Sequence, residues 1–339
     1  MKMKNTLSSN RGQIIVFIAF VIALLMVTGV TVINTATISE TQRASGPDLQ
    51  SHDATDEYHN FIRESEQTIK SVNHDPTIDG SNKRNVAISS VEETAFLYGI
   101  QSQQYGTAIQ ADIPDEGSTD VSDGTRVTQV LRSDVTSVDG DTDWVVVNNA
   151  ENIRAVSMNI ESVTDIQATS TNPFEITLTE STGNSETISI SDSPAANTFT
   201  VQYNSAVTGE QINCDVTEQY GDSITLDFIA GKFLHRSCPE YPIGDEPIES
   251  ISISNGDRLE NTRYSLVATD TGSETFGPMN EASSAPSVYP SDGDEEYNGQ
   301  DPVRHPAVYS IDVGVRVSGH NTLVEGDVVL APGTTQTNT

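Results

Sequence analysis

The chain has 339 residues, of which 49 are Asp or Glu and 17 are Lys or Arg, so its formal net charge at pH 7 is −32. This acidic excess excludes a protein that binds nucleic acid by neutralising phosphates. Hydrophobic residues make up 35% of the chain, enough for the core of one large or two modest domains.

Charge is unevenly distributed along the chain. The first 36 residues carry three basic side chains and no acidic one, and the whole sequence has only five lysines. At about 1 M salt the Debye length falls to about 3 Å, so a surface this acidic stays hydrated without repelling itself. The composition favours a salt-adapted protein of the halophilic, archaeal kind. A partly disordered acidic tail is the alternative, but apolar residues alternate through most of the acidic region.

A hydrophobic segment of twenty uncharged residues lies at 14–33. At about 1.5 Å per residue, a helix of that length crosses about 30 Å of hydrocarbon, so we predict a transmembrane helix over 14–36. Its length favours retention over cleavage as a secretory signal. Basic residues precede it and none follows before Arg43, so residues 1–13 are expected to be a cytoplasmic basic leader. The expected location is the cell membrane, crossed once, with the C-terminal domain outside.

Arg11, Gly12 and Gln13 stand immediately before the hydrophobic segment. They resemble the processing site of archaeal type IV prepilins, which is cut after the glycine. A glycine lets the backbone approach a membrane-embedded peptidase closely. The resemblance implies cleavage between Gly12 and Gln13 by a prepilin-type peptidase. Many pilins carry Glu at the fifth mature position, where this chain has Phe17, so an uncut signal anchor is the alternative.

Two helices are predicted beyond the membrane segment. Apolar residues recur at three and four positions over roughly 48–72, which indicates an amphipathic helix. A second helix is expected to begin near Ser90, whose spacing to Glu93 fits a capping box, and to end before Gly106. Residues 37–108 are therefore expected to form a helical stalk and packing helices.

From about residue 109 the apolar period changes to two, which indicates half-buried strands. The pattern is clearest at 309–317, which a turn joins to 323–330 as a C-terminal hairpin. Short strands separated by Gly, Asn, Asp and Ser are typical of an antiparallel sandwich or curved sheet. These patterns predict a β-rich extracellular domain over 109–333.

The predicted fold class is α+β: an N-terminal transmembrane helix and amphipathic helices, followed by a mainly antiparallel β-sandwich or curved sheet. The stretch at 271–306 is rich in Ser, Pro, Gly and acidic residues, and we expect a long surface loop there. Residues 334–339 are expected to be a flexible C-terminal tail.

These features together resemble a haloarchaeal family of single-pass, pilin-like secreted proteins that has no established activity. The resemblance rests on the RGQ-preceded hydrophobic segment, on PAVYSIDVGVRV at 306–317 and on VVLAPG at 328–333, and it covers nearly the full chain. It implies the membrane topology and a link to type IV pilus-like assembly, with other pilin-like subunits as partners. The chain is longer than a typical pilin, which argues against a major filament subunit.

The sequence contains two cysteines, Cys214 and Cys238. Thiols oxidise readily outside the cell, and two cysteines close a loop if their Cα atoms come within about 7 Å. We expect a disulfide, worth roughly 3–4 kcal/mol in the chain-entropy model. The nearby His235 would suit a catalytic thiol, but a structural bridge is the simpler interpretation.

Motifs for metal binding and catalysis are absent from the sequence. Asp139, Asp141 and Asp143 have the opening spacing of a calcium loop, but Trp144 and Ala150 stand where Gly and Glu are needed. No HExxH, GxSxG or glycine-rich phosphate loop occurs. We therefore expect no enzyme activity, no catalytic residue, no cofactor and no metal site.

One acidic cluster could attract divalent cations by its charge, although a solvated loop is the better interpretation in so acidic a chain. The cluster consists of Asp292, Asp294, Glu295, Glu296 and Asp301.

Three functions of different classes stay open. The expected one is a membrane-anchored extracellular structural protein of a halophilic archaeon, pilin-like or pseudopilin-like. The second is an uncut, signal-anchored extracellular binding module for a cell-surface partner or ligand. The third is an extracellular hydrolase with scattered catalytic carboxylates, which sequence alone cannot recognise because their separation is unknown.

Overall fold

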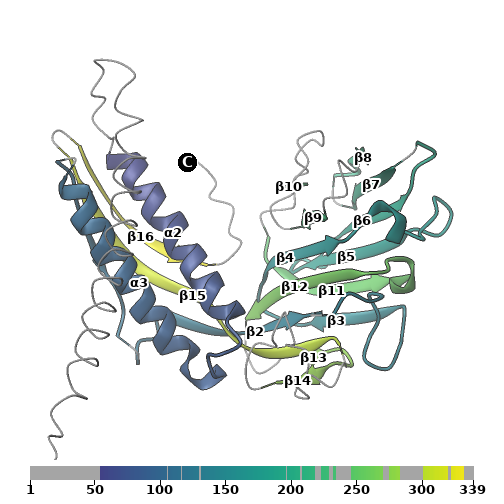
Figure 1. The fold of residues 1–339 in the computed structure, drawn as a ribbon, viewed down its shortest axis with the longest axis horizontal. Coiled ribbons are helices and arrows are strands. Elements are labelled where there is room, and N and C mark those ends of the chain that lie inside the picture. The colour runs from purple at the N-terminus through teal and green to yellow at the C-terminus, as the bar shows by residue number, and fades with distance from the viewer. Residues whose placement is uncertain are drawn as a thin grey trace, which may run out of the picture. The chain divides into compact units, whose positions relative to one another are not determined.

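The fold was obtained as a computed structural model (Figure 1). The chain divides into two compact units, 1–51 and 52–339. All of the described residues belong to the second unit. The first unit, which includes the predicted transmembrane helix, lies outside the described residues. The described residues are 54–104, 106–115, 117–129, 131–195, 197–206, 208–217, 223–228, 232–233, 246–269, 275–282, 301–319 and 322–331.

Two antiparallel helices, α2 (Ala54–His74) and α3 (Gly80–Gln103), form one layer of the fold. In α2 the apolar positions spaced by three and four are buried, as predicted, and include Phe61 and Ile69. Phe61, near the start of α2, packs edge-to-face on Tyr98, near the end of α3, with ring centres 6.0 Å apart. This contact places the beginning of α2 beside the end of α3.

The second helix begins earlier than the sequence predicts, at Gly80 and not near Ser90. Its N-cap is Asp79, whose Oδ1 accepts a hydrogen bond from the Ser81 N–H at 3.0 Å. Ser90 lies inside the helix, where its carbonyl accepts from the Thr94 hydroxyl at 2.9 Å. The first turns of α3 are polar, so the sequence shows no apolar periodicity there. The capping-box pattern of Ser90 and Glu93 therefore predicted too late a start for the helix.

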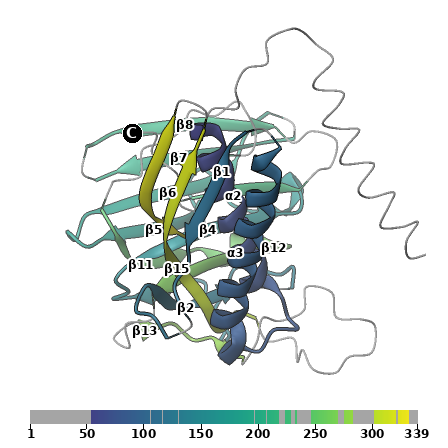
Figure 2. The ribbon, with the colours of Figure 1, turned by 90° about the vertical axis from the view of Figure 1, so that its left-hand side faces the viewer.

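The helices cover one face of three strands: β1 (Ala108–Asp112), the C-terminal half of β15 (Val303–Ser318) and β16 (Leu323–Leu330) (Figures 1 and 2). β15 pairs antiparallel with β16 on one side and with β1 on the other, so the predicted C-terminal hairpin is confirmed. Alternate β15 residues are buried against the helices, as the period of two predicts. They are Ile311, Val313, Val315 and Val317.

Two sheets pack face to face in the rest of the molecule and enclose the larger core. The first sheet continues from β15 through β2 (Val121–Thr128), β12 (Thr262–Thr269), β4 (Ile153–Ile160), β9 (Ile224–Asp227) and β10 (Lys232–Phe233). The second has the order β13 (Thr275–Phe276), β3 (Trp144–Asn148), β11 (Ile248–Ser254), β5 (Phe174–Glu180), β6 (Ser185–Asp192), β7 (Thr198–Ser205) and β8 (Gln211–Thr217). Two short 3-10 helices, Val163–Asp165 and Gly256–Arg258, connect strands.

Strand β15 belongs to both parts of the fold. Its N-terminal half pairs with β2, with His305 opposite Arg126, and its C-terminal half pairs with β1 and β16 under the helices. The pairing with β2 shifts register between Val308 and Ser310. The helical layer and the sandwich are therefore joined by one continuous strand.

The predicted α+β class is wrong for the described part of the chain, and the transmembrane helix predicted over 14–36 lies outside that part. The described residues form a mostly β fold of curled antiparallel sheets, with only two α-helices in that part of the chain. Neither of these helices is long and apolar enough to cross a membrane. The prediction gave too much weight to the helical N-terminal pattern, because long-range strand pairing organises most of the described chain.

The predicted surface loop at 271–306 is also partly wrong. It contains β13, β14 (Asn280–Glu281) and the first residues of β15, while 271–274 and 283–300 lie outside the described residues. β14 pairs with β15 in parallel, the exception among the described strand pairs. Two-residue strands leave no periodic signal, because their partners in space define them.

Candidate functional site

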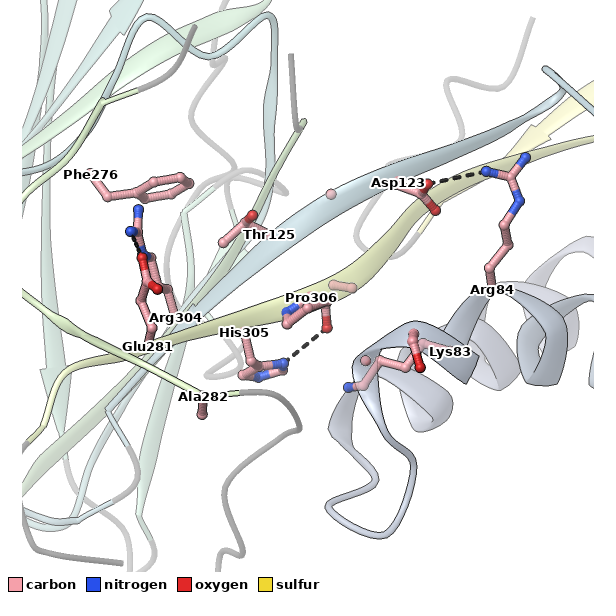
Figure 3. A pocket seen from close by; sticks show the side chains of 14 residues that line it. Lys83, Arg84, Asp123, Thr125, Phe276, Glu281, Ala282, Arg304, His305 and Pro306 are labelled. Atoms are coloured by element: carbon pink, nitrogen blue, oxygen red, sulfur yellow. Dashed lines mark hydrogen bonds and ion pairs between the residues drawn. The ribbon is translucent and has the colours of Figure 1, made fainter. Parts of the chain in front are cut away.

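A cavity of about 650 Å³ lies where the first turn of α3 approaches β2, β14 and β15 (Figure 3). Four of its lining side chains are basic or imidazole groups: Lys83, Arg84, Arg304 and His305. The chain has 49 acidic residues and only 17 basic ones, so a cavity lined by this many nitrogen-bearing side chains is unexpected for its composition. We take this region as the candidate site.

Cations at the rim of the cavity are paired with carboxylates. Arg84 Nη1 lies 3.1 Å from Asp123 Oδ2. Arg304 forms an ion pair with Glu281, and its guanidinium lies 5.1 Å from the ring centre of Phe276. The side chains of both carboxylates are more than half exposed, so these pairs are weak and an incoming anion can compete for the guanidiniums.

Deeper in the cavity the nitrogen-bearing groups are buried. Lys83 is 1% exposed, and its Nζ donates to the carbonyl oxygen of Asn73 at 2.7 Å. His305 is also 1% exposed; Nδ1 donates to the carbonyl oxygen of Pro306 at 3.1 Å, and Nε2 accepts from Arg126 Nη1 at 3.4 Å. These partners assign the His305 proton to Nδ1 and occupy both ring nitrogens.

Lys83 and Arg126 form no ion pair with a carboxylate in the described part of the chain. Burial lowers the pKa of Arg126 to about 9. Burial and the charge of Arg126 lower the pKa of Lys83 to about 8, with Asp75 acting in the opposite sense. Burial, Lys83 and Arg126 lower the pKa of His305 to about 3. At neutral pH the imidazole is therefore neutral beside two uncompensated cations.

A second cavity, of about 40 Å³, adjoins Arg126. Lys70 and His74 line it from α2, and two serines line it from β4 and β12. Arg126 Nε donates to Ser265 Oγ at 2.9 Å. Burial and then the charge of Arg126 lower the pKa of His74 to about 3. We call three cations and two neutral histidines the cation cluster: Lys70, Lys83, Arg126, His74 and His305.

The cation cluster is suited to holding a negatively charged group. Its buried members present N–H donors and positive charge in a site of low dielectric, where an anion is attracted strongly. Ser81, a hydroxyl of the larger cavity, donates to Asp79 at 2.6 Å, and both nitrogens of His305 are occupied. The described lining residues therefore offer recognition of an anion.

A cavity of about 970 Å³ beside the segment that joins β1 to β2 and the middle of β15 has the opposite character. Burial and then the charge of Asp120 raise the pKa of Asp312 in this cavity. Within the described ranges, no group of three or more His, Cys, Asp and Glu side chains could hold a metal ion. The cavity is lined by Asp112, Asp115, Asp120, Asp312 and Asp327.

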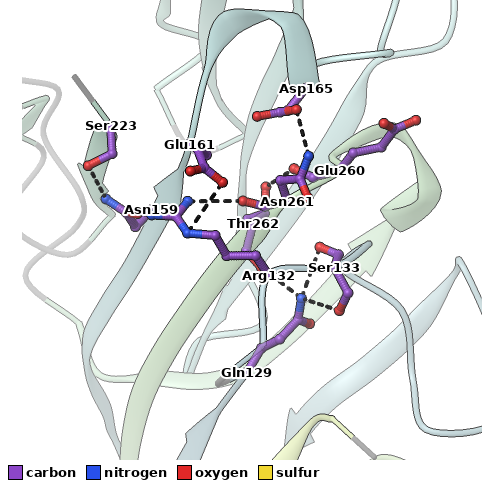
Figure 4. A network of polar contacts seen from close by, with 10 residues as sticks. All are labelled: Gln129, Arg132, Ser133, Asn159, Glu161, Asp165, Ser223, Glu260, Asn261 and Thr262. Atoms are coloured by element: carbon purple, nitrogen blue, oxygen red, sulfur yellow. Dashed lines mark hydrogen bonds and ion pairs between the residues drawn. The ribbon is translucent and has the colours of Figure 1, made fainter. Parts of the chain in front are cut away.

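A polar network joins the segment after β2 to the neighbouring strand ends (Figure 4). Gln129 is 1% exposed, and its Nε2 donates to the carbonyl oxygen of Thr262 at 2.8 Å. Arg132 pairs with Glu161 at 3.5 Å and donates to Asn159 at 3.2 Å. These bonds satisfy polar groups where strands end, so the network stabilises the sandwich.

The predicted processing residues Arg11, Gly12 and Gln13 lie outside the described residues. So do Cys238 and all of the acidic cluster except Asp301, whose Oδ2 accepts the Leu131 N–H at 2.5 Å. Cys214 lies on β8, is 7% exposed and is disulfide-bonded. Asp139, Asp141 and Asp143 lie around the turn before β3, where the Asp143 carboxylate accepts the Asn255 N–H at 2.9 Å.

Sequence reasoning missed the cation cluster entirely. Lys70, Lys83 and Arg84 lie close together in a chain with few basic residues, and that local concentration was the available signal. Arg126 and His305 carried no signal, because they are 179 positions apart and meet only through the pairing of β2 with β15.

The fold and the cavity define the class of this protein as a helix-capped antiparallel β-sandwich with a buried cation cluster. Compared with protein-family models and with curated proteins, the chain finds no significant match.

Proposed function

We propose that the protein is a membrane-anchored extracellular structural protein of a halophilic archaeon, pilin-like or pseudopilin-like, without catalytic activity. In this proposal the hydrophobic segment 14–33 is the anchor, and the β-rich domain faces the medium. The observation that carries the proposal is β15, the strand shared by the helical layer and the sandwich.

A shared strand suits a body that must transmit load from its anchor. The helices that follow the anchor in sequence pack on the second half of β15, and the first half of β15 pairs with β2 of the sandwich sheet. Force entering through α2 would therefore reach the sandwich through rows of backbone hydrogen bonds. A flexible linker would allow the two parts to move separately.

An exposed apolar surface on α3 supports assembly with further copies of this chain. Phe96, Leu97 and Ile100 are 68%, 56% and 48% exposed, and we call them the α3 patch. The patch lies beside the beginning of α2, because α2 and α3 are antiparallel. We assign a second copy as the occupant, since co-anchoring raises the effective concentration of like patches.

Mass spectrometry of the N-terminus of the native membrane protein tests pilin-type processing. A mature chain that starts at Gln13 supports the proposal, because cleavage after Gly12 leaves the hydrophobic segment in place. Intact residues 1–12 would contradict pilin-type processing and support a plain signal anchor. Recovery of the protein from the cytosol, or shed without residues 14–33, would contradict membrane anchoring altogether.

The second candidate is a signal-anchored binding module, and the cation-lined cavity of about 650 Å³ favours it. A carboxylate-rich ligand would replace Glu281 and Asp123 as partners of Arg304 and Arg84. Calorimetric titration of the full chain with citrate tests this candidate. Arg304→Gln should weaken citrate binding about tenfold, as expected for the loss of one charge-assisted contact, while Arg316→Gln on β15 should leave it unchanged. Equal binding by both variants would contradict a site in this cavity.

A further inference from the structure

The smaller cavity beside Arg126 combines a positive lining with restricted volume. Arg126 is 7% exposed and forms no ion pair with a carboxylate in the described chain. Buried cations in proteins are normally paired, because an unpaired one loses its hydration without compensation. In the described chain, Arg126 therefore lacks the negatively charged partner that a buried guanidinium normally has.

Neutral groups accept hydrogen bonds from only some of the N–H groups of the Arg126 guanidinium. Nε donates to Ser265 Oγ, and Nη1 donates to His305 Nε2, while the group also lines the cavity. The Ser265 hydroxyl accepts from Arg126, so its own proton is free to point elsewhere. His74 and Lys70, which line the same space, make no hydrogen bond with a described acceptor, and Lys70 is exposed at its edge.

One carboxylate, Asp227 on β9, also lines the cavity. Asp227 already interacts with another group, and it forms no ion pair with Arg126. The lining thus keeps an excess of donors and positive charge even when Asp227 is counted.

The volume limits which anion can enter. The cavity is small, about 40 Å³ against about 650 Å³ for the larger one. A monatomic anion is smaller than phosphate or sulfate and is the better match for so small a space. We propose that the cavity is a halide site, in which chloride lies between the Arg126 guanidinium, His74 and the Ser265 hydroxyl and supplies the missing negative charge.

This inference is independent of the proposed structural function. It explains how an acidic chain keeps an unpaired guanidinium under the α2–α3 hairpin, where a charge without a partner would loosen the packing. In a chloride-rich medium the site would be filled, so the helical layer would be held on the sandwich by the ion as well as by apolar contacts.

Thermal unfolding of the full chain in detergent tests the proposal, with fluorescence of the single tryptophan, Trp144, as the readout. Replacing sodium chloride by sodium gluconate at constant sodium should lower the melting temperature by about 5 °C or more, as for loss of a ligand held at about a hundred times its Kd. Arg126→Met should abolish this difference. Arg132→Met, which removes a guanidinium that is paired with Glu161 and lies outside the cavity, should retain it.

Crystals of the full chain grown in sodium bromide provide a readout that does not depend on a folded variant. An anomalous bromide peak in contact with Arg126 and His74 is the expected result. Absence of bromide from the cavity would overturn the proposal, and so would equal chloride dependence of Arg126→Met and Arg132→Met.

Discussion

Asn73 and Val308 are joined by two hydrogen bonds through one side-chain amide. Asn73 Nδ2 donates to the Val308 carbonyl at 2.7 Å, and Asn73 Oδ1 accepts the Val308 N–H at 2.8 Å. Asn73 is 1% exposed at the end of α2, and Val308 lies where β15 shifts register against β2. The amide thus satisfies backbone groups of β15 and fixes α2 at the point where the two parts of the fold join.

Asn73→Ala should destabilise the protein by about 2–4 kcal/mol, because it leaves a buried N–H and a buried carbonyl without partners. Urea unfolding followed by tryptophan fluorescence measures the change in the free energy of unfolding. Asn82→Ala, an exposed position in the first turn of α3, should change it by less than about 0.5 kcal/mol. Equal effects of the two substitutions would show that the Asn73 amide does not stabilise the join.

Lowering the pH should destabilise the protein partly through His305. The unfolded histidine has a pKa near 6.5, whereas burial and nearby cations lower the folded-state pKa to about 3. Between these values the unfolded chain binds more protons, so the free energy of unfolding decreases by about 1.4 kcal/mol for each unit that pH falls. His74 contributes in the same sense, because its folded-state pKa is also about 3.

His305→Gln should reduce the number of protons taken up on unfolding by about one. The free energy of unfolding of this variant should therefore decline less steeply than that of the wild type between pH 6 and 4. Urea unfolding at each pH measures the slope. His59→Gln, on the exposed face of α2, should decline as steeply as the wild type. An unchanged slope in His305→Gln would mean that the His305 imidazole is not held neutral in the folded state.

Gly256→Ala should lower the free energy of unfolding by about 3 kcal/mol or more. A Cβ at Gly256 would overlap the carbonyl oxygen of Val135, and that carbonyl belongs to the backbone and cannot move alone. Gly117→Ala is the matched control, because nothing lies within 4 Å of its added Cβ. Thermal unfolding of the two variants makes the comparison, and similar melting temperatures would contradict the close approach.

Phe96→Ser should weaken self-association of the full chain in membranes about tenfold, because burying a Phe side chain contributes about 1.5–3 kcal/mol. Cross-linking as a function of protein density in liposomes measures the association. Val145→Ser removes an exposed apolar side chain from β3 and should have no effect. Unchanged cross-linking of Phe96→Ser would contradict an α3 patch that packs on a second copy.

Several elements could be predicted because the signal lies within the element itself. Alternation from Tyr309 to Val317 predicted the second half of β15, and spacing by three and four predicted most of α2. These signals are readable because one face of each element is buried and the other is not. The start of α3 was mispredicted, because Asp79 caps a polar first turn that carries no apolar period.

The sequence by itself determined the acidic surface, the hydrophobic segment at 14–33, the cysteine pair and the alternation of most strands, since each of these depends on composition or on near neighbours along the chain. Only the tertiary structure decided the mostly β class, the strand shared between the two parts and the cation cluster. Arg126 and His305 become partners because β2 and β15 pair in one register, and a one-residue shift would turn His305 to the opposite face of the sheet. Such a site depends on contacts between distant segments, so the basic residues at 70–84 could be noticed in the sequence, but their partners Arg126 and His305 could not be predicted from it.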